Sequence, residues 1–421
     1  MYMQGLQDIL QRNKHVNWAM MDQILVSGVN FITTILLARF IGVEEFGIFS
    51  LVWMAILFAN SFQHALILAP LMSLAPNISN NIGQYCGTLL IHQIVLSTIL
   101  SGFFFAFGTL IWTDLSPDLL LPAIAALFIW QLQELSRKYF YTFRKPSTAV
   151  KISAVKYLAQ ISFIIFAWKI EKNWLDASNV LWIVSFSSML SVIYALFHLE
   201  GVNFKKETFL TTTQQHWLFS KWLAGSVVLQ WVSGNMLLVM CGIILGPVVL
   251  GAFRAAQSLV GAANVLFQAL ENIAPIQAAQ NFKLNGRVGL ISYLNRLSIL
   301  GGSGTVLFVA VLAVFPNFWM ELFFGPEYSG YGNILIWFSV IYCVVFASIP
   351  IRIGLRTLKQ SKPIFWGYVV STVFTALAAY PLIVSIGQTG VALGILVSQL
   401  IGTLICWFSL KHVLLANISE Q

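Results

Sequence analysis

The sequence predicts an all-α membrane protein whose twelve transmembrane helices form two parallel six-helix lobes with a central cleft. Three observations predict this class: the composition, the charges of the loops, and an internal repeat. Of 421 residues, 58% are apolar and 9% are charged, whereas soluble domains are about 25% charged. Such a chain cannot cover a water-facing surface with charge. The composition therefore excludes a soluble enzyme and a nucleic-acid-binding domain, and nucleic acid is not an expected partner.

Apolar runs bounded by charges and turn residues predict twelve helices, because a span needs about 20 apolar residues. In chain order they cover residues 18–41, 46–72, 85–112, 118–143, 148–169, 174–198, 217–244, 247–275, 290–315, 331–352, 363–385 and 388–410. The first run is too long for a signal peptide and ends without a cleavage-site pattern. Glycines separate some runs through tight turns, as in Gly42-x4-Gly47 and Gly246-x4-Gly251.

The signs of the loop charges support this count and orient the chain. With a cytoplasmic N-terminus, 19 of the 23 Lys and Arg residues fall on the inner side, as the positive-inside rule requires. The exceptions are Arg39, Lys169, Lys172 and Arg254. Twelve spans place both termini in the cytoplasm. The polar stretch 200–216 is then a cytoplasmic linker between a first lobe, 1–199, and a second lobe, 217–421.

The two halves of the sequence resemble each other at an offset of 204 residues. The identical pairs are Gly42/Gly246, Gly47/Gly251, Phe49/Phe253, Ala59/Ala263, Asn60/Asn264, Ala65/Ala269 and Leu66/Leu270. Six helices per half is an even number, so the repeats are parallel. Parallel repeats form two lobes with a binding site between them and work by alternating access. The repeat therefore predicts a transporter rather than a fixed pore.

Ionisable residues inside spans are costly and usually mark a cavity or an ion pathway. The carboxylates Asp22, Glu134 and Glu271 are candidates for coupling transport to H⁺ or Na⁺. The alternative is that each one pairs with a basic residue. Glu134 has the i,i+3 and i,i+4 spacing that would let it pair with Arg137 and Lys138 on one helix face.

Cations and amides in the spans, or directly beside them, are candidates for binding an anionic sugar ligand. They are Arg39, Arg137, Lys138, Arg144, Lys156, Arg254, Asn60, Asn264 and Gln131. The alternatives are that the cations anchor the helices to lipid headgroups and that the amides pack between helices. The sequence contains no Walker A, HExxH or GxSxG motif. It therefore predicts neither an enzyme nor a metal site, and no cofactor besides the coupling ion.

Three stretches resemble the polysaccharide-export branch of the multidrug/oligosaccharidyl-lipid/polysaccharide exporter superfamily. They are NWAMMDQILVSGVNFITTILLARFIGVEEFGIFSL, LQELSRKYFYTFRKPSTAV and ELFFGPEYSGYGNILIWF. The resemblance spans nearly the whole chain and implies the same twelve-helix, two-lobe architecture. Members of this branch flip an undecaprenyl-pyrophosphate-linked oligosaccharide across the bacterial inner membrane.

The resemblance implies a flippase of the O-antigen (lipopolysaccharide), capsule or exopolysaccharide type. Its expected partners are the lipid-linked oligosaccharide, the bilayer, a polysaccharide polymerase and a chain-length regulator. One alternative is a cation-coupled multidrug antiporter, although the in-span charges lean positive. Another is a membrane polysaccharide polymerase or ligase, which the short outer loops disfavour. The sugar composition, the coupling ion and the oligomeric state do not follow from the sequence.

Overall fold

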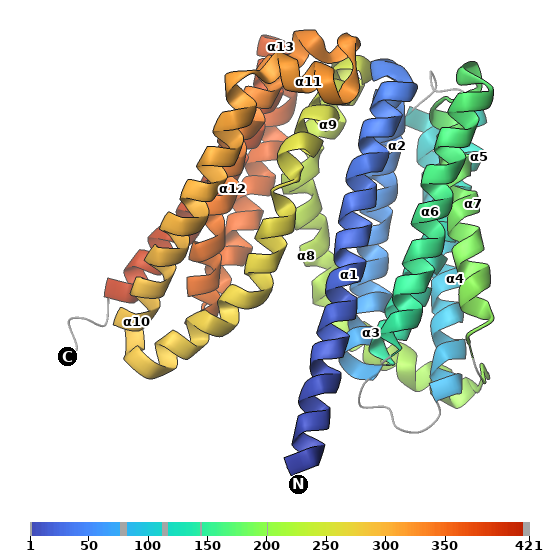
Figure 1. Cartoon of the computed structure of the whole chain (residues 1–421), viewed down its shortest axis with the longest axis vertical. Helices are drawn as coiled ribbons and strands as arrows, with labels where there is room; N and C mark the ends of the chain where they lie inside the picture. The colour runs from blue at the N-terminus through green and yellow to red at the C-terminus, as the bar shows by residue number, and fades with distance from the viewer. Residues whose placement is uncertain (1, 76–81, 112–116, 144, 200, 416–421) are drawn as a thin grey trace. The chain divides into compact units, whose positions relative to one another are not determined.

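The computed structural model describes residues 2–75, 82–111, 117–143, 145–199 and 201–415, in which helices alternate with short connections and no β-strand occurs (Figure 1). The earlier helices are α1 (Tyr2–Phe40), α2 (Gly42–Gln63), α3 (Ala69–Leu74), α4 (Ile82–Ile111), α5 (Leu120–Thr142), α6 (Pro146–Ile170) and α7 (Ala177–Leu196). The later helices are α8 (Lys206–Ile244), α9 (Pro247–Gly261), α10 (Asn264–Val314), α11 (Pro316–Phe324), α12 (Gly332–Thr357) and α13 (Lys362–Leu415). Short helical turns are η1 (His64–Leu68), η3 (Pro117–Leu119), η4 (Lys172–Trp174) and η5 (Pro326–Tyr331).

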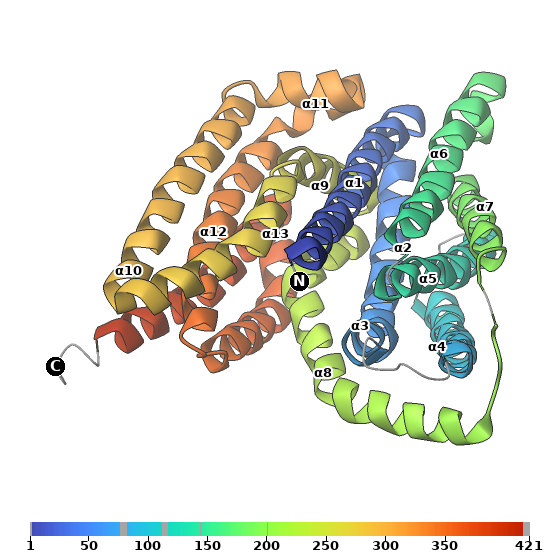
Figure 2. The ribbon, with the colours of Figure 1, turned by 60° about the horizontal axis from the view of Figure 1, so that its bottom comes forward.

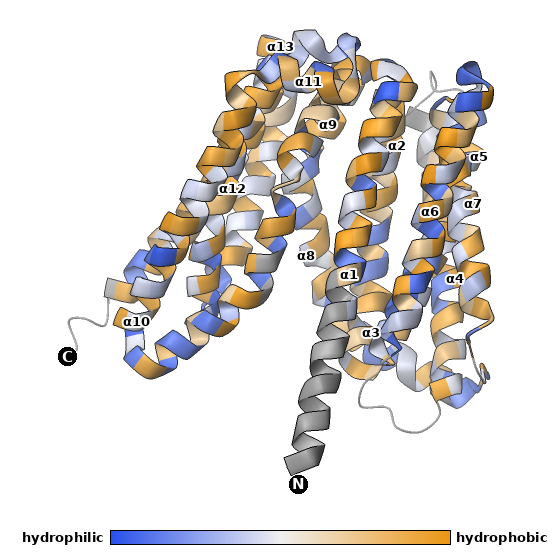
Figure 3. Cartoon of the chain, viewed as in Figure 1, coloured by the Kyte–Doolittle hydropathy of each residue, from blue (hydrophilic) through white to orange (hydrophobic). Residues whose placement is uncertain are grey.

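The all-helical membrane class is confirmed. Within the described residues, nine helical segments are long and apolar enough to cross a membrane, and Figure 3 shows hydrophobic residues along the lengths of the helices. The count of twelve stays a prediction. Two of the long helices contain a break, at Asn285–Gly286 in α10 and at Ile386–Gly387 in α13. Both glycines have a positive φ, 57° and 59°, and both breaks fall between helices that the sequence predicts as separate.

The chain forms two compact units. Unit 1 comprises Met1–Ile41 and Val52–Val228, and unit 2 comprises Gly42–Leu51 and Leu229–Gln421. Helices α2 and α8 therefore each run from one unit into the other. Helix α8 begins inside the stretch expected to be the linker, and the change of unit falls later, between Val228 and Leu229. The lobe limits 1–199, 200–216 and 217–421 stay predictions.

Unit 1 is a helical bundle in which α5, α6 and α7 contact one another, α1 packs on α6, and α4 packs on α5 (Figure 1). The first turns of α8 lie across the beginning of α4 (Figure 2). Their contacts are polar: the Thr208 hydroxyl donates to Gln84 Oε1 at 2.8 Å, and the Tyr85 hydroxyl lies 2.9 Å from His216 Nε2. These contacts explain why this polar stretch folds as a helix instead of remaining an extended linker.

In unit 2, α12 packs against α9, α10 and α13, and the backbone shows the internal repeat directly. Gly42, the first residue of α2, and Gly246, which directly precedes α9, are equivalent in the two halves and have φ of 80° and 90°. Gly47 lies against the carbonyl oxygen of Pro247, and Gly251 lies against that of Val43, so neither glycine has room for a Cβ. The contact is reciprocal at the offset of 204 residues, which shows that the repeated glycines allow these two helix starts to approach closely.

Candidate functional site

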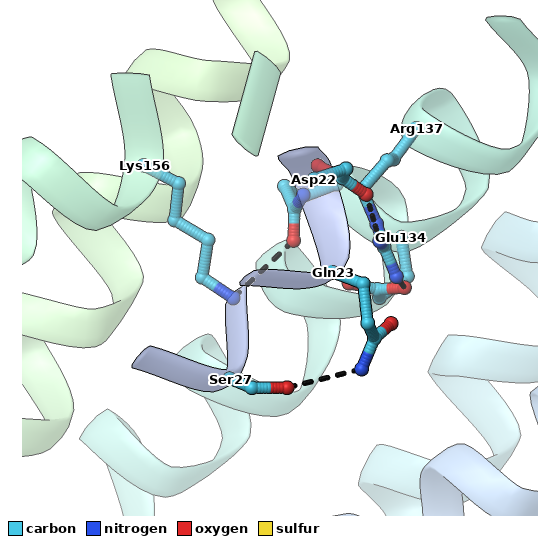
Figure 4. A network of polar contacts seen from close by, with 7 residues as sticks. Asp22, Gln23, Ser27, Glu134, Arg137 and Lys156 are labelled. Atoms are coloured by element: carbon cyan, nitrogen blue, oxygen red, sulfur yellow. Dashed lines mark hydrogen bonds and ion pairs between the residues drawn. The ribbon is translucent and has the colours of Figure 1, made fainter. Parts of the chain in front are cut away.

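A buried ion-pair network in unit 1 joins α1 to α5 (Figure 4). Arg137 donates from Nη1 to Asp22 Oδ2 and from Nη2 to Glu134 Oε2, both at 2.7 Å. The three side chains are 13%, 4% and 10% exposed, respectively. The predicted i,i+3 pair of Glu134 and Arg137 is thus confirmed, and Asp22, which is 115 positions from Arg137, is a second acid partner of the same guanidinium.

Lys156 of α6 approaches the same region and is 2% exposed. Its Nζ donates to Gln133 Oε1 at 3.3 Å and lies 5.1 Å from the Trp130 ring centroid and 4.7 Å from that of Tyr157. A ring face attracts an ammonium group, most strongly where water is excluded. The polar contacts of Lys156 are thus with an amide oxygen and two aromatic rings, whereas Arg137 pairs directly with the two carboxylates.

The periodicity of α5 explains how one helix supplies most of the cluster. Trp130, Glu134 and Arg137 recur every three to four residues and therefore lie on one face of the helix. A buried charge is tolerated only when it is paired and hydrogen-bonded, and here each charge has a partner. The cluster can stabilise the packing of α1, α5 and α6, and its carboxylates can exchange a counter-ion.

Gln131 lies in a separate amide network that joins α2, α4 and α5. Gln63 donates to Gln93 Oε1 at 2.7 Å and to the Gln131 carbonyl at 2.6 Å, while Ser97 donates to Gln131 Oε1 at 2.7 Å. Gln63, Gln93, Ser97 and Gln131 are all fully buried. These contacts match the packing alternative for Gln131, because every amide is turned toward another helix.

The other candidates of unit 1 are scattered. Arg39 is exposed at the end of α1, and Lys138 is partly buried one residue after Arg137. Asn60 is partly buried, and its Oδ1 atom lies inside the protein without a hydrogen-bond partner among the described residues. Arg144 lies outside the described residues.

Unit 2 carries a polar stripe along α9 and the start of α10. Its members recur at alternating intervals of three and four positions and so share one helix face. They are Arg254, Gln257, Gly261, Asn264, Gln268 and Glu271. Asn264, Gln268 and Glu271 are exposed. Exposed amides on a membrane helix are costly against lipid, so this face suits a wet cavity.

Arg254 stands at the head of this stripe and is partly buried. Its Nη1 donates to Gln257 Oε1 at 2.6 Å, and within the described part of the chain no carboxylate pairs with it. Farther along the stripe, the Asn264 amide donates to the Tyr342 hydroxyl at 3.1 Å. Among the described residues, no carboxylate therefore balances the positive charge of Arg254, whereas two carboxylates pair with Arg137 in unit 1.

Glu271 lies near Arg352 of α12, with Arg352 Nη2 3.7 Å from Glu271 Oε1. All three candidate coupling carboxylates thus have an arginine partner, as the pairing alternative expects. Ion coupling at Asp22, Glu134 and Glu271 stays a prediction. In the sequence, Arg352 counts only as one of the inner-side charges, although in the structure it lines a small cavity of unit 2. Most of the serines, the tyrosine and the glutamine that line the cavity with Arg352 are far from it in the sequence, so no local pattern indicates that they lie together.

Comparison with known proteins identifies the family of the chain. The model of a family described as "Polysaccharide biosynthesis protein" matches residues 13–272, more than half of the chain. A search of curated proteins finds no match.

Solved structures share the fold. One titled "Lipid II flippase MurJ, inward closed conformation" superposes with a TM-score of 0.69 at 14% identity, covering 94% of this chain and 87% of that one. An inward-facing multidrug resistance MATE family transporter of the MOP superfamily gives 0.68 at 13% identity, covering 96% and 95%. A MOP superfamily transporter from Pyrococcus furiosus gives 0.60 at 11% identity, covering 96% and 94%. One of these neighbours is named as a flippase and the other two as transporters. The chain belongs to the polysaccharide biosynthesis protein family and has the fold of the MOP superfamily transporters.

Proposed function

We propose that the protein moves a polyprenyl-pyrophosphate-linked oligosaccharide across the bacterial inner membrane by alternating access. The main support for the proposal is that Arg254, a cation at the head of a polar stripe, has no acid partner among the described residues. A guanidinium without an acid partner attracts an anion, and its fork matches phosphate oxygens. The exposed amides of Asn264 and Gln268 suit sugar hydroxyls farther along the same face.

The energetics of flipping explain why such a cation is needed. A pyrophosphate in bare hydrocarbon loses its hydration at a cost of many kcal/mol. A cation in a wet cleft replaces part of that hydration, and the polyprenyl tail stays in the lipid. No covalent bond is broken in this step, so the protein needs sites for the head and the sugars but no catalytic group.

In this proposal, the network of unit 1 has a different role from the stripe of unit 2. Arg137 is committed to Asp22 and Glu134, so it holds helices together or takes part in exchange of H⁺ or Na⁺. Glu271 is a further coupling candidate. Arg39, Lys138, Arg144 and Lys156 remain proposed contacts for the anionic substrate.

Two comparisons support a lipid-linked substrate. The family is described by polysaccharide biosynthesis, and one structural neighbour is named as a flippase of lipid II. The corresponding product is an O-antigen, capsule or exopolysaccharide. In this setting both termini face the cytoplasm, and the polymerase and chain-length regulator receive the flipped unit.

The rival function is that of a cation-coupled multidrug antiporter, which other structural neighbours represent. A cationic drug requires carboxylates that are free to bind it. Asp22 and Glu134 share one arginine in this structure, and Arg254 would repel a cation. The paired carboxylates of unit 1 therefore disfavour a cationic drug, and Arg254 of unit 2 favours an anionic substrate.

The test is a deletion strain complemented with wild type, Arg254→Gln or Arg296→Gln, the last changing an exposed arginine of α10. Surface polysaccharide and undecaprenyl-linked oligosaccharide are measured together with the amount of protein in the membrane. We expect the deletion to lose polymer and accumulate the precursor. Arg296→Gln should restore the polymer and Arg254→Gln should not. Unchanged polymer in the deletion strain, with increased sensitivity to cationic dyes, would favour the antiporter.

A further inference from the structure

Unit 2 contains a small, partly open cavity lined by polar residues of α8, α12 and α13. Its volume is about 50 Å³, and its lining is rich in hydroxyl and amide groups. The residues important here are Arg352 of α12 and Tyr368, Ser371, Ser398 and Gln399 of α13. A buried water needs roughly 10–15 Å³ of such space. The cavity therefore has room for a few waters or one small tetrahedral anion.

Arg352 reaches this cavity with unused hydrogen-bonding capacity. Its Nε is buried and has no partner within the described part of the chain. Its Nη1 is 3.3 Å from the Tyr368 hydroxyl, and its Nη2 is 3.7 Å from Glu271. Glu271 has a side chain that is 44% exposed, so it is a loosely held counter-ion. A third acceptor is needed to satisfy the guanidinium.

The cavity offers donors to that acceptor. The Tyr368 hydroxyl accepts from Arg352 and therefore keeps its own hydrogen to donate. No hydrogen bond to the Gln399 side chain is seen among the described residues, which leaves its amide group available. Arg352, Tyr368 and Gln399 thus supply donors from two helices to one cavity.

Two backbone carbonyl oxygens near the cavity already accept side-chain hydrogen bonds. Ser371 donates to the Ser398 carbonyl at 2.9 Å, and Ser398 donates to the Ser233 carbonyl at 3.3 Å. A bare metal cation would need such oxygens as ligands, and Arg352 would repel it. The arrangement of donors around an arginine fits an oxyanion instead.

We propose that this cavity binds a phosphate group through Arg352, Tyr368 and Gln399. The inference rests on the proposed function in one respect: there, the phosphate belongs to the polyprenyl-linked substrate, and the cavity is a second anion subsite besides Arg254. Inorganic phosphate and the headgroup of an anionic phospholipid present the same chemistry. Binding requires Arg352 to exchange its long contact with Glu271 for shorter contacts with the phosphate oxygens.

The test measures ligand-induced changes in thermal stability of the purified full-length protein in detergent. The probes are inorganic phosphate, inorganic pyrophosphate, undecaprenyl phosphate and phosphatidylglycerol. The variants are Arg352→Gln, Arg352→Lys and Tyr368→Phe, with Arg356→Gln as the matched control, because Arg356 is exposed one turn along the same helix. We expect wild type and the control to be stabilised, and Arg352→Gln to bind at least one probe roughly tenfold more weakly.

Arg352→Lys keeps the charge but loses the Nε donor and the fork, so it tests the site even if the glutamine variant does not fold. Stabilisation by undecaprenyl phosphate alone identifies the substrate as the source of the phosphate. Stabilisation by inorganic phosphate or by phosphatidylglycerol supports the cavity and assigns it to that other source. The inference is overturned if no probe stabilises wild type, or if Arg352→Lys and Tyr368→Phe respond as wild type does.

The complementation assay separates this inference from the proposed function. Loss of polymer on deletion, with no phosphate-dependent stabilisation of wild type, leaves the flippase standing and removes the phosphate site. If stabilisation depends on Arg352 but deletion leaves the polymer unaffected, the phosphate site stands and the flippase function is refuted.

Discussion

Replacing Arg137 with glutamine should destabilise the protein more than any single change at the surface. The substitution leaves Asp22 and Glu134 buried, at 4% and 10% side-chain exposure, without their shared cation. Breaking a buried ion pair from one side costs about 3–5 kcal/mol, because the remaining charge is uncompensated. Asp22→Asn should cost less, about 1–3 kcal/mol, since Arg137 then retains Glu134.

The assay is chemical unfolding of the purified protein in detergent micelles, followed by tryptophan fluorescence. A double-mutant cycle of Asp22→Asn and Arg137→Gln should give a coupling energy of about 1–3 kcal/mol, because the two side chains share a 2.7 Å contact. Lys151→Gln on α6 is the control, since Lys151 is exposed and surface changes stay within about 0.5 kcal/mol. A loss below about 1 kcal/mol for Arg137→Gln, or additive effects in the cycle, would refute this account of the network.

Three further changes test other parts of the structure. Gly47→Ala places a Cβ against the carbonyl of Pro247 and should destabilise unit 2. Gly28 has open space around it, so Gly28→Ala should be neutral or should stabilise the protein by up to about 1 kcal/mol. Equal unfolding midpoints for the two variants would contradict this expectation. Glu327→Gln weakens the acceptor of the Val43 amide, 3.1 Å away, and should cost about 0.5–2 kcal/mol, measured in the same unfolding assay. Alkaline phosphatase fused after Lys172 should be active and after Lys205 inactive, because the first site is predicted to be outside and the second inside; the opposite pattern would reverse the topology.

The helical class could be predicted because each span must satisfy its own backbone hydrogen bonds in lipid. The long apolar runs and the glycine turns indicate the helices from neighbouring residues alone. The breaks at Gly286 and Gly387 fall where the sequence predicts helix ends, since glycine adopts the positive φ that these turns require. The start of α8 at Lys206 was not predicted, because the helix depends on polar contacts with Gln84 and Tyr85 of α4.

The pairing of charges could be predicted only where it is local. Glu134 and Arg137 are neighbours on one helix, and their spacing indicates the contact. Asp22 has no such relation to Arg137, and Lys156 finds Gln133 and two aromatic rings across helices. The sequence therefore predicts Arg137 only as a candidate for binding an anion, whereas in the structure it is paired with Asp22 and Glu134.

The distribution of unpaired charge separates residues that hold the fold from residues that can select an anion. In unit 1, Arg137 has two short contacts with carboxylates, so adding a phosphate would require breaking one of them. In unit 2, Arg254 has only an amide partner among the described residues, and Arg352 has one long contact with a carboxylate. Their helices, α9 and α12, contact each other within this unit. Removing Arg137 should therefore lower stability while a surviving protein still binds phosphate, and removing Arg254 or Arg352 should weaken phosphate binding with a smaller loss of stability.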